Sequence, residues 1–440
     1  MFGMDSCMSR IAAALTTVIL SVTAVSGDGA ASDANAPFSC IFMENNTLDG
    51  KREGLNFTID QEHAGQVEKA RHYAMAIVGW GEDEPDNKYM GEEGKLNLIL
   101  SQIKKASPST RTIAYCGQFE NVVPFYDAQR RVLTDPAYKG FLMHDDNGMP
   151  LPGASAGGVG GGIWDFRNSS AREYLAKEVA GYFARSGNAD GVFFDEGDSF
   201  ACHYDCKRHN TCKVMPSADE WHAGAIEGWV LVAEEMARVG KHAVISSQNS
   251  FNASTPYLEK TPHGCPKSED YAFDVMNRSA LARAGWMRFY EYWGFPASDK
   301  GPLHCSNFIR NAAKETQELG VPIVASGSDF RIPGEKTKRQ RIDYSLAMFL
   351  VARSTHSYFG FNHGGWAKWP RWSDAETSWA EIKPWVTKEY GEALGPTVEV
   401  TSGVFVREYE NVTVKVDCTT GDSIYDWKAA TQSPHNFLMV

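Results

Sequence analysis

Short apolar segments alternate with helical patterns along most of this chain, and this alternation constrains the fold more than any other feature. Eight segments are apolar on both faces, as parallel strands must be when helices cover them. The predicted strands are 39–44, 73–81, 110–117, 191–195, 242–247, 288–294, 321–329 and 356–362. Eight strands with intervening helices favour an α/β fold, a (β/α)8 TIM barrel with long loops.

A doubly wound open sheet is the alternative fold. No G-x-G-x-x-G motif follows the first predicted strand. The run GGVGGG at 157–162 follows a loop and has no Lys-Ser/Thr after it, so we interpret it as a flexible loop. The barrel is therefore the preferred fold.

Several helices carry terminal signals. Ser170 and Glu173 are spaced as a capping box, with Leu175, Val179 and Tyr182 as the apolar stripe that follows. A second box is predicted at Ser217 and Glu220, and Gly240 is expected to end that helix. The apolar stripe of the second helix comprises Trp221, Ala225, Trp229, Val232 and Met236. Further helices are predicted at 95–106, 305–319 and 338–353, with the basic segment EKTKRQR (335–341) as a solvent-exposed helix start.

The C-terminal part differs from the rest. Residues 398–418 alternate between apolar and polar side chains with no helix between the two halves, which predicts an antiparallel hairpin. We therefore expect a short C-terminal antiparallel β appendage to the barrel. The expected organisation is a signal peptide at 1–26, the barrel at 38–395, and the β appendage and tail at 396–440.

The N-terminus predicts the compartment. Arg10 precedes a 15-residue apolar run at 11–25, and small residues follow it. This pattern is typical of a secretory signal peptide, with an uncleaved signal anchor as the alternative. We expect a secreted or secretory-pathway protein that has no membrane contact after signal cleavage. The net charge of −12 argues against a nucleic-acid or anionic-membrane partner.

Cysteines and glycosylation sequons agree with an oxidising compartment. Of nine cysteines, Cys7 lies in the signal, which leaves eight for disulfides. The candidate disulfide cysteines are Cys40, Cys116, Cys202, Cys206, Cys212, Cys265, Cys305 and Cys418, with the pairing left open. The candidate N-glycosylation sites are Asn45, Asn56, Asn168, Asn252, Asn277 and Asn411.

The cysteines at 202–212, together with His203 and His209, could also form a zinc site. They lack the paired C-x2-C spacing of strong zinc motifs. Disulfides are the preferred interpretation, and no metal or other cofactor is expected.

Polar and aromatic side chains gather where the predicted strands end. In a (β/α)8 barrel the C-terminal strand ends and the following loops form the site. The candidate catalytic carboxylates are Asp195, Glu196, Glu291 and Asp329. The candidate substrate-binding residues are Glu44, Trp80, Asp165, Gln248, Asn249, Trp293, Asn362, His363 and Trp366. Carboxylates with amides and tryptophans are typical of a sugar site, although an Asp after a strand is often only a turn residue or a helix N-cap.

Two stretches carry a resemblance to known families. The segment from IWDFRN (163–168) to ADGVFFDE (189–196) resembles retaining barrel glycosidases of the α-glucosidase/α-xylosidase type. The tail GVFVREYENVTVKV (403–416) is similar to a segment of hypothetical glycoside hydrolase-like barrel families. The resemblance implies that Asp195 is the nucleophile, or a general base in an inverting enzyme. It also aligns Asp165 with the Asp-Phe element of those glycosidases, whose role stays open.

The chain also departs from known patterns. The acid/base segment of the α-glucosidase family is missing, so strand position alone suggests Glu291 first and Asp329 second as the other carboxylate. Phe193 and Gly197 break the chitinase pattern D-G-x-D-x-D-x-E.

The sequence therefore predicts a glycoside hydrolase that cleaves O-glycosidic bonds of a poly- or oligosaccharide with two carboxylates at the barrel mouth. A carbohydrate-binding barrel without activity and a zinc-dependent hydrolase are the alternatives. The sugar, the linkage and the stereochemical outcome stay open.

Overall fold

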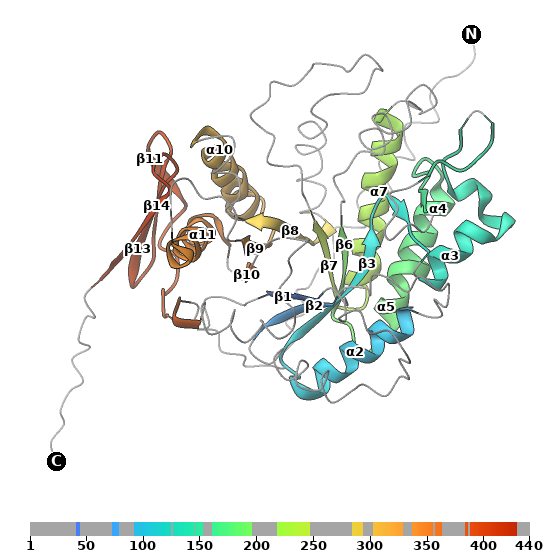
Figure 1. Ribbon diagram of the computed structural model, residues 1–440, viewed down its shortest axis with the longest axis horizontal. Helices are drawn as coiled ribbons and strands as arrows, with labels where there is room; N and C mark the ends of the chain where they lie inside the picture. The colour runs from blue at the N-terminus through green and yellow to red at the C-terminus, as the bar shows by residue number, and fades with distance from the viewer. Residues whose placement is uncertain are drawn as a thin grey trace, which may run out of the picture. The chain divides into compact units, whose positions relative to one another are not determined.

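Eight strands build the central sheet of the protein in a computed structural model (Figure 1). They are β1 (Ile41–Glu44), β2 (Met75–Val78), β3 (Arg111–Gln118), β6 (Gly191–Asp195), β7 (His242–Ser246), β8 (Trp286–Trp293), β9 (Ile323–Ser328) and β10 (Tyr358–Asn362). The structure describes residues 41–44, 73–78, 92–124, 126–145, 147–152, 161–195, 218–246, 284–293, 302–328, 337–354, 357–362, 383–385 and 388–428.

The strand order identifies the sheet as a barrel. The strands follow one another in sequence order, and every neighbouring pair is parallel. In a doubly wound sheet the order of the strands reverses at a switch point, whereas the order of these strands follows the sequence throughout. Cα atoms of β1 and β10 also approach within 8 Å, which brings the two ends of the sheet together. The predicted (β/α)8 fold is confirmed.

Helices connect the strands as predicted. The main ones are α2 (Glu92–Ala106), α7 (Ala218–Ala237), α10 (Pro302–Ala313) with η5 (Lys314–Glu318), and α11 (Lys338–Ala352). The whole predicted stripe of α7 is buried, and Gly240 adopts a positive φ of 71° beyond its end. Thr337 and Gln340 form a capping box at the start of α11, so the basic segment is confirmed as a helix start. Ser217 lies outside the described residues.

A long insertion separates β3 from β6. It contains β4 (Asn121–Val122), α3 (Asp127–Thr134), the 3-10 turn η2 (Pro136–Phe141) and β5 (Gly162–Ile163). It ends in a helix made of α4 (Ser169–Tyr174), the π-helical segment η3 (Leu175–Ala180) and α5 (Gly181–Arg185).

This last helix corrects two predictions. Its N-cap is Asn168, whose Oδ1 accepts a hydrogen bond of 2.9 Å from the Ser170 amide, so the capping box predicted at Ser170 is wrong. Tyr182 is 37% exposed and Phe183 takes the buried position. The π segment adds one residue to a helical turn and thereby rotates the buried face by one position. Because the Asn168 Nδ2 also donates to the Gly140 carbonyl at 2.7 Å, we expect little glycosylation at this sequon.

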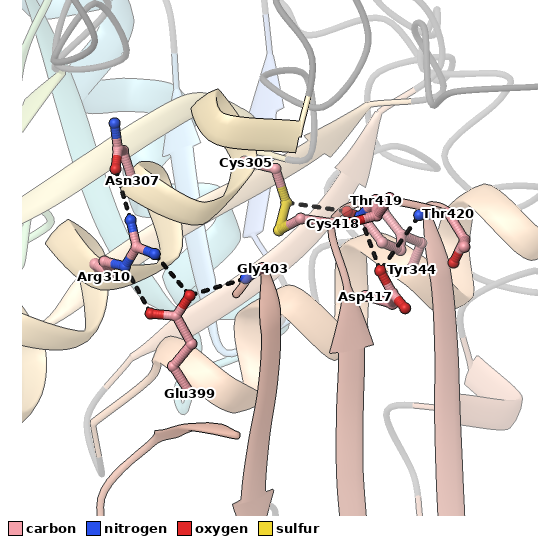
Figure 2. Close-up of a disulfide and its surroundings, with 10 residues drawn as sticks. All are labelled: Cys305, Asn307, Arg310, Tyr344, Glu399, Gly403, Asp417, Cys418, Thr419 and Thr420. Atoms are coloured by element: carbon pink, nitrogen blue, oxygen red, sulfur yellow. Dashed lines mark hydrogen bonds and ion pairs between the residues drawn. A yellow bond between two sulfur atoms is a disulfide. The ribbon is translucent and has the colours of Figure 1, made fainter. Parts of the chain in front are cut away.

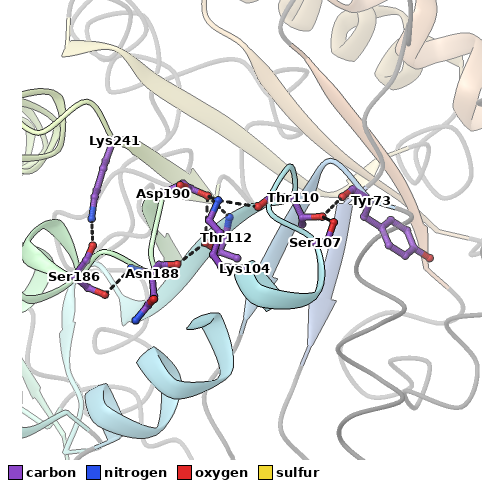
Figure 3. A network of polar contacts seen from close by, with 9 residues as sticks. All are labelled: Tyr73, Lys104, Ser107, Thr110, Thr112, Ser186, Asn188, Asp190 and Lys241. Atoms are coloured by element: carbon purple, nitrogen blue, oxygen red, sulfur yellow. Dashed lines mark hydrogen bonds and ion pairs between the residues drawn. The ribbon is translucent and has the colours of Figure 1, made fainter. Parts of the chain in front are cut away.

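Hydrogen bonds tie β3 and β6 together at their N-terminal ends (Figure 3). The Asp190 Oδ2 accepts from the Thr112 amide at 2.7 Å and forms an ion pair with Lys104. Lys104 also donates to the Thr110 carbonyl at 3.0 Å, and the Thr112 hydroxyl donates to the Asn188 carbonyl at 2.6 Å. Asp190 is therefore a structural residue at the end of the barrel opposite to the expected site.

The C-terminal residues form a four-stranded antiparallel sheet, one hairpin larger than predicted. Its strands are β11 (Val398–Thr401), β12 (Val404–Glu408), β13 (Val412–Asp417) and β14 (Asp422–Trp427). Phe405, Val412, Val414 and Val416 are buried in one cluster with residues of α10 and α11. The predicted range 398–418 contains three of these strands, and β14 lies beyond it; none of the six residues of β14 is buried, so its pattern is not that of a covered strand.

A disulfide and an ion pair fasten this sheet to α10 (Figure 2). Cys305 is bonded to Cys418, and Arg310 donates to both oxygens of Glu399 at 2.7 and 2.6 Å. Cys116, in contrast, is a free thiol that is fully buried in β3, so its prediction as a disulfide cysteine is wrong. Burial, with Glu93 nearby, raises the pKa of the Cys116 thiol well above its usual value.

The free Cys116 leads to a testable thiol count. With Cys305 and Cys418 paired and Cys116 free, five of the eight predicted cysteines remain, which is an odd number. Denatured, unreduced protein without its signal should therefore react with at least two equivalents of a thiol reagent per chain, or contain a bridge between chains. Complete absence of reactive thiols in a monomer would contradict this assignment. A Cys116→Ala variant should react with one equivalent fewer.

Arg407 and Tyr409 from the C-terminal sheet cap the end of α11. Arg407, which is buried, donates to the carbonyls of Leu350, Arg353 and Gly395. The Tyr409 hydroxyl donates to the Leu350 carbonyl at 2.5 Å. These bonds satisfy carbonyls that a helix C-terminus leaves without partners, and the Arg407 charge interacts favourably with the negative end of the helix dipole.

We expect Arg407→Met to lower the free energy of unfolding by about 2 to 3 kcal/mol, because charged hydrogen bonds to buried carbonyls are lost. Chemical denaturation measures this. The matched control is Arg238→Met, which removes an exposed ion pair with Glu235 and should leave the free energy of unfolding nearly unchanged. Equal effects of the two substitutions would contradict the capping role.

Several predictions lie outside the described residues. They include the signal peptide, Cys40, the cysteines at 202–212, Cys265, the glycine run before Gly161, and the sequons at Asn45, Asn56, Asn252 and Asn277. Within the described part of the chain, no helix is both long and apolar enough to cross a membrane.

Candidate functional site

Asp195 ends β6, a strand whose five residues are all buried. The alternation of side chains assigns each residue to one side of the sheet. Phe194 packs against Phe119 with ring centroids 5.5 Å apart, and Phe119 lies 5.2 Å from Trp229 of α7, so Phe194 faces the helices. Phe193 and Asp195 therefore face the other way.

The ring of Phe193 shows that this other side is the barrel interior. It lies 5.1 Å from the ring of Phe289 on β8, and β7 separates β6 from β8 in the sheet. A contact between two such strands crosses the interior. Asp195, two residues beyond Phe193, thus projects into the barrel at the C-terminal end of β6, where barrels of this type place their sites.

Asp195 is buried at the end of its strand. Its side chain is 2% exposed, and its Oδ2 accepts a hydrogen bond of 3.0 Å from the hydroxyl of Tyr115 on β3. Its backbone carbonyl accepts from the Phe119 amide at 2.8 Å, which extends the β3–β6 pairing to the strand end. Tyr115 was not predicted from the sequence. The available signal was its place in the same alternation as Ile113 within an apolar strand, with a polar hydroxyl at its tip.

The other strand-end candidates are placed by their backbones alone. Glu44 is the last residue of β1, Glu291 and Trp293 belong to the final residues of β8, and Asn362 ends β10. Because all eight strands are parallel, these residues and Asp195 belong to the same end of the barrel. Their side chains lie outside the described part of the structure. Trp80, Glu196, Gln248, Asn249, Asp329, His363 and Trp366 lie wholly outside it.

The strand that carries Glu291 has a distinctive local structure. Arg288 forms a buried ion pair of 3.3 Å with Glu315 of η5, and the Tyr290 hydroxyl bonds to the same carboxylate. The Tyr290 ring also lies 5.4 Å from Phe308 of α10, so Tyr290 faces the helices. The register with β9 then shifts between Tyr290 and Trp293, the stretch that contains Glu291. Irregularities of this kind re-aim side chains and are frequent beside active sites.

Asp165 has a visible structural role. Its two carboxylate oxygens accept from the Nε and Nη2 of Arg167, both at 2.8 Å, and its carbonyl accepts from the Asn168 amide at 2.9 Å. These contacts form the turn that leads into α4. Contact of Asp165 with a substrate stays a prediction.

Metal ligands do not cluster in the part of the chain that the structure describes: no group of three or more His, Cys, Asp and Glu there could hold an ion. The cysteines and histidines of the zinc alternative lie outside that part.

Residues 104–413, well over half of the chain, match a known sequence family. The chain belongs to hypothetical glycosyl hydrolase family 15. The match to hypothetical glycosyl hydrolase family 15 includes Tyr115, Asp195 and Arg407, and it confirms the predicted resemblance to hypothetical glycoside hydrolase-like barrels. No curated protein matches this chain.

Solved structures similar to this member of hypothetical glycosyl hydrolase family 15 are distant. An α-galactosidase from Thermus thermophilus is 12% identical, with 87% of this chain and 66% of that chain covered and a TM-score of 0.44. Amy13B from Eubacterium rectale is 8% identical, with 86% and 85% covered and a TM-score of 0.48. A dextranase from Flavobacterium johnsoniae is 11% identical, with 87% and 45% covered and a TM-score of 0.48. The chain spans less than two thirds of the length of the first two structures that it matches, at 66% and 64%.

Proposed function

We propose that this protein is a secreted glycoside hydrolase that cleaves O-glycosidic bonds of a poly- or oligosaccharide. The observation that carries the proposal is the buried Asp195 carboxylate, which projects into the barrel at the C-terminal end of β6 in a chain of a glycosyl hydrolase family. The predicted signal peptide supports secretion.

In the proposed reaction Asp195 is the nucleophile. One carboxylate oxygen forms a bond to the anomeric carbon while the bond from that carbon to the leaving oxygen breaks. The electron pair of the broken bond stays with the leaving oxygen, which takes a proton from a second carboxyl group. Water, deprotonated by the same second group, then hydrolyses the glycosyl ester.

Glu291 is the proposed second carboxyl group. It belongs to the same end of the barrel as Asp195, and it lies in the irregular stretch of β8. A retaining reaction requires the two carboxyl groups to be about 5 to 5.5 Å apart, whereas inversion requires roughly 6.5 to 9.5 Å to admit a water molecule. Asp329 is the second choice for this role.

A panel of aryl α- and β-glycosides, oligosaccharides and polysaccharides tests the proposed function. Wild-type protein should release reducing sugar from at least one class, and proton NMR of the first product should show the anomer of the substrate if the enzyme retains configuration. Binding of the same sugars without any release would favour the alternative, a carbohydrate-binding barrel without activity. If the protein neither releases sugar from these substrates nor binds them, the proposal is contradicted.

A further inference from the structure

We propose that Asp343 makes the attachment of the C-terminal sheet to α11 stronger in mildly acidic solution than in neutral solution. The inference goes beyond the proposed function and is independent of it, because it assigns no step of the reaction to Asp343. It is supported by the position of the carboxyl group in the contact between helix and sheet, and by the groups that surround it.

Asp343 lies in the second turn of α11, where the helix meets the C-terminal sheet. The hydroxyl of Tyr425 on β14 donates a hydrogen bond of 2.6 Å to the Asp343 backbone carbonyl. Two aromatic rings from the chain before β11 lie beside the Tyr425 ring, that of Trp385 at 5.9 Å and that of the buried Tyr390 at 6.5 Å. The charge of Asp343 therefore stands in the contact that attaches the sheet.

One oxygen of the Asp343 side chain has no hydrogen-bond donor. Its Oδ1 is buried, and within the described part of the chain no group donates to it. Burial of a carboxyl oxygen without a donor costs free energy, and the cost is larger for the charged form than for the protonated form. The contact between α11 and the sheet is therefore more favourable when Asp343 holds a proton.

Two cations near Asp343 reduce this cost without removing it. The Cζ of Arg339, one turn earlier in α11, lies 5.3 Å from the centre of the Trp385 ring. The Nζ of Lys388 lies 4.2 Å from the centre of the same ring and 4.8 Å from that of Trp427. Both cations are thus held over aromatic rings, and neither donates to Oδ1. Burial raises the pKa of Asp343 to about 6, although Arg339 and Lys388 act in the opposite direction.

The other titratable groups around Asp343 do not neutralise its charge. Tyr390 faces it from the chain before β11 and Tyr425 faces it from β14, and burial raises the pKa of both hydroxyls, so they stay neutral. Two carboxylates of the sheet, Asp417 and Asp422, act on the tyrosine that follows Asp343 in the helix. Neither kind of group supplies a positive charge at Oδ1.

The direction of the pH effect follows from the pKa of Asp343 in the folded and the unfolded chain. An aspartate in an unfolded chain has a pKa of about 3.9, so the folded protein holds this proton more tightly. The contribution of Asp343 to stability is complete below about pH 4 and is lost as the pH rises through about 6. Neutral solution therefore weakens the attachment of the sheet.

Asp343→Asn tests the proposal, because an amide has nearly the shape of the carboxyl group and carries no charge at any of these pH values. At pH 7.5 the Tm of this variant should be about 1 to 3 °C above that of the wild type. The difference should fall toward zero at pH 4.5, where Asp343 of the wild type is protonated. A difference that is the same at both pH values, or a lower Tm of the variant at pH 7.5, would overturn the proposal.

Asp426→Asn is the matched control. It removes the same charge from β14, where Asp426 is exposed and follows Tyr425, so its side chain points away from α11. The control is needed because the net charge is −12, and the loss of any negative charge reduces repulsion. Asp426→Asn should change the Tm little at either pH. Equal gains in the two variants at pH 7.5 would show a general charge effect and contradict the role of Asp343.

Hydrogen–deuterium exchange locates the effect in the chain. After correction for the intrinsic exchange rates, peptides that cover β13 and β14 should exchange more slowly in Asp343→Asn than in the wild type at pH 7.5, and equally at pH 4.5. Peptides that cover β2 and β3 are the internal reference and should differ less. If protection changes to the same extent in both regions, the charge acts on the whole protein, and the proposed effect on the attachment of the sheet is wrong.

NMR of ¹³C-labelled aspartate carboxyl carbons measures the pKa of Asp343 directly, and the signal is assigned by its loss in Asp343→Asn. The midpoint should lie at about 6. It should rise further in Lys388→Met, which keeps the apolar stem of the side chain and removes a cation that lowers the pKa of Asp343. A midpoint at the usual value of about 4 in the wild type would overturn the proposal.

Discussion

Asp195→Asn should lower kcat by about 1000-fold or more on any substrate that the wild type cleaves. An amide oxygen is a far weaker nucleophile than a carboxylate, and it cannot form a stable glycosyl ester. The substitution keeps the shape of the side chain and an acceptor for the Tyr115 hydroxyl, so the fold should be retained. Steady-state kinetics with thermal denaturation of the same preparation measure both effects.

Asp190→Asn is the matched control for this loss. It changes the same residue type directly before β6, at the opposite end of the strand, where Asp190 contacts Lys104 and Thr112. This substitution should lower the free energy of unfolding by about 1 to 2 kcal/mol and leave kcat within about twofold. Near-normal activity of Asp195→Asn would show that the nucleophile is elsewhere.

A rescue experiment with a second variant tests the same role of Asp195. Added azide should restore turnover of activated aryl glycosides by Asp195→Gly if Asp195 is the nucleophile.

Gly224→Ala should be the most damaging of the small substitutions in the described helices. Gly224 lies in α7, where its Cα faces the backbone of Phe166. A Cβ at this position would lie 2.0 Å from the Phe166 carbonyl oxygen, and main-chain atoms cannot turn aside as a side chain can. The helix must move away from the segment that precedes α4. We expect a loss of about 3 kcal/mol in the free energy of unfolding, measured by denaturant titration.

Gly228→Ala provides a control one turn further along the same helix. Its Cβ would meet the Phe119 ring at 3.5 Å, an ordinary van der Waals contact. Because alanine favours the helix over glycine by about 1 kcal/mol, this variant should be as stable as the wild type or more stable. If both variants lose a similar amount of unfolding free energy, the clash with the Phe166 backbone is not the reason for the loss at Gly224.

The barrel could be predicted from the sequence because its strands are covered on both sides and bounded by turns. GVFFD at 191–195 was predicted with the bounds that β6 has. The errors arise where a local rule is overridden by its context. The π segment η3 moves Tyr182 to the surface and buries Phe183, and no pattern in the sequence signals such an insertion. Asn168 takes the N-cap position because the turn made by Asp165 delivers it there.

The site was predictable only in part for a similar reason. Asp195 could be found because strand order and alternation assign it to the C-terminal end of an apolar strand. Tyr115 could not, because its role depends on the register between β3 and β6, which are separated by more than 70 residues of insertion. The structural role of Asp190 also depends on contacts with α2 and β3 that no local pattern contains.

The approach of the first strand to the last has a consequence during synthesis on the ribosome. Glu44 ends β1 and Tyr358 begins β10, so more than 300 residues emerge before the sheet can close. At a typical elongation rate this takes roughly 15 to 60 s, during which β1 presents an open parallel edge. The nascent chain therefore depends on delayed closure or on chaperones to avoid pairing with other chains. Truncation before Tyr358 should yield insoluble fragments and not a smaller soluble barrel.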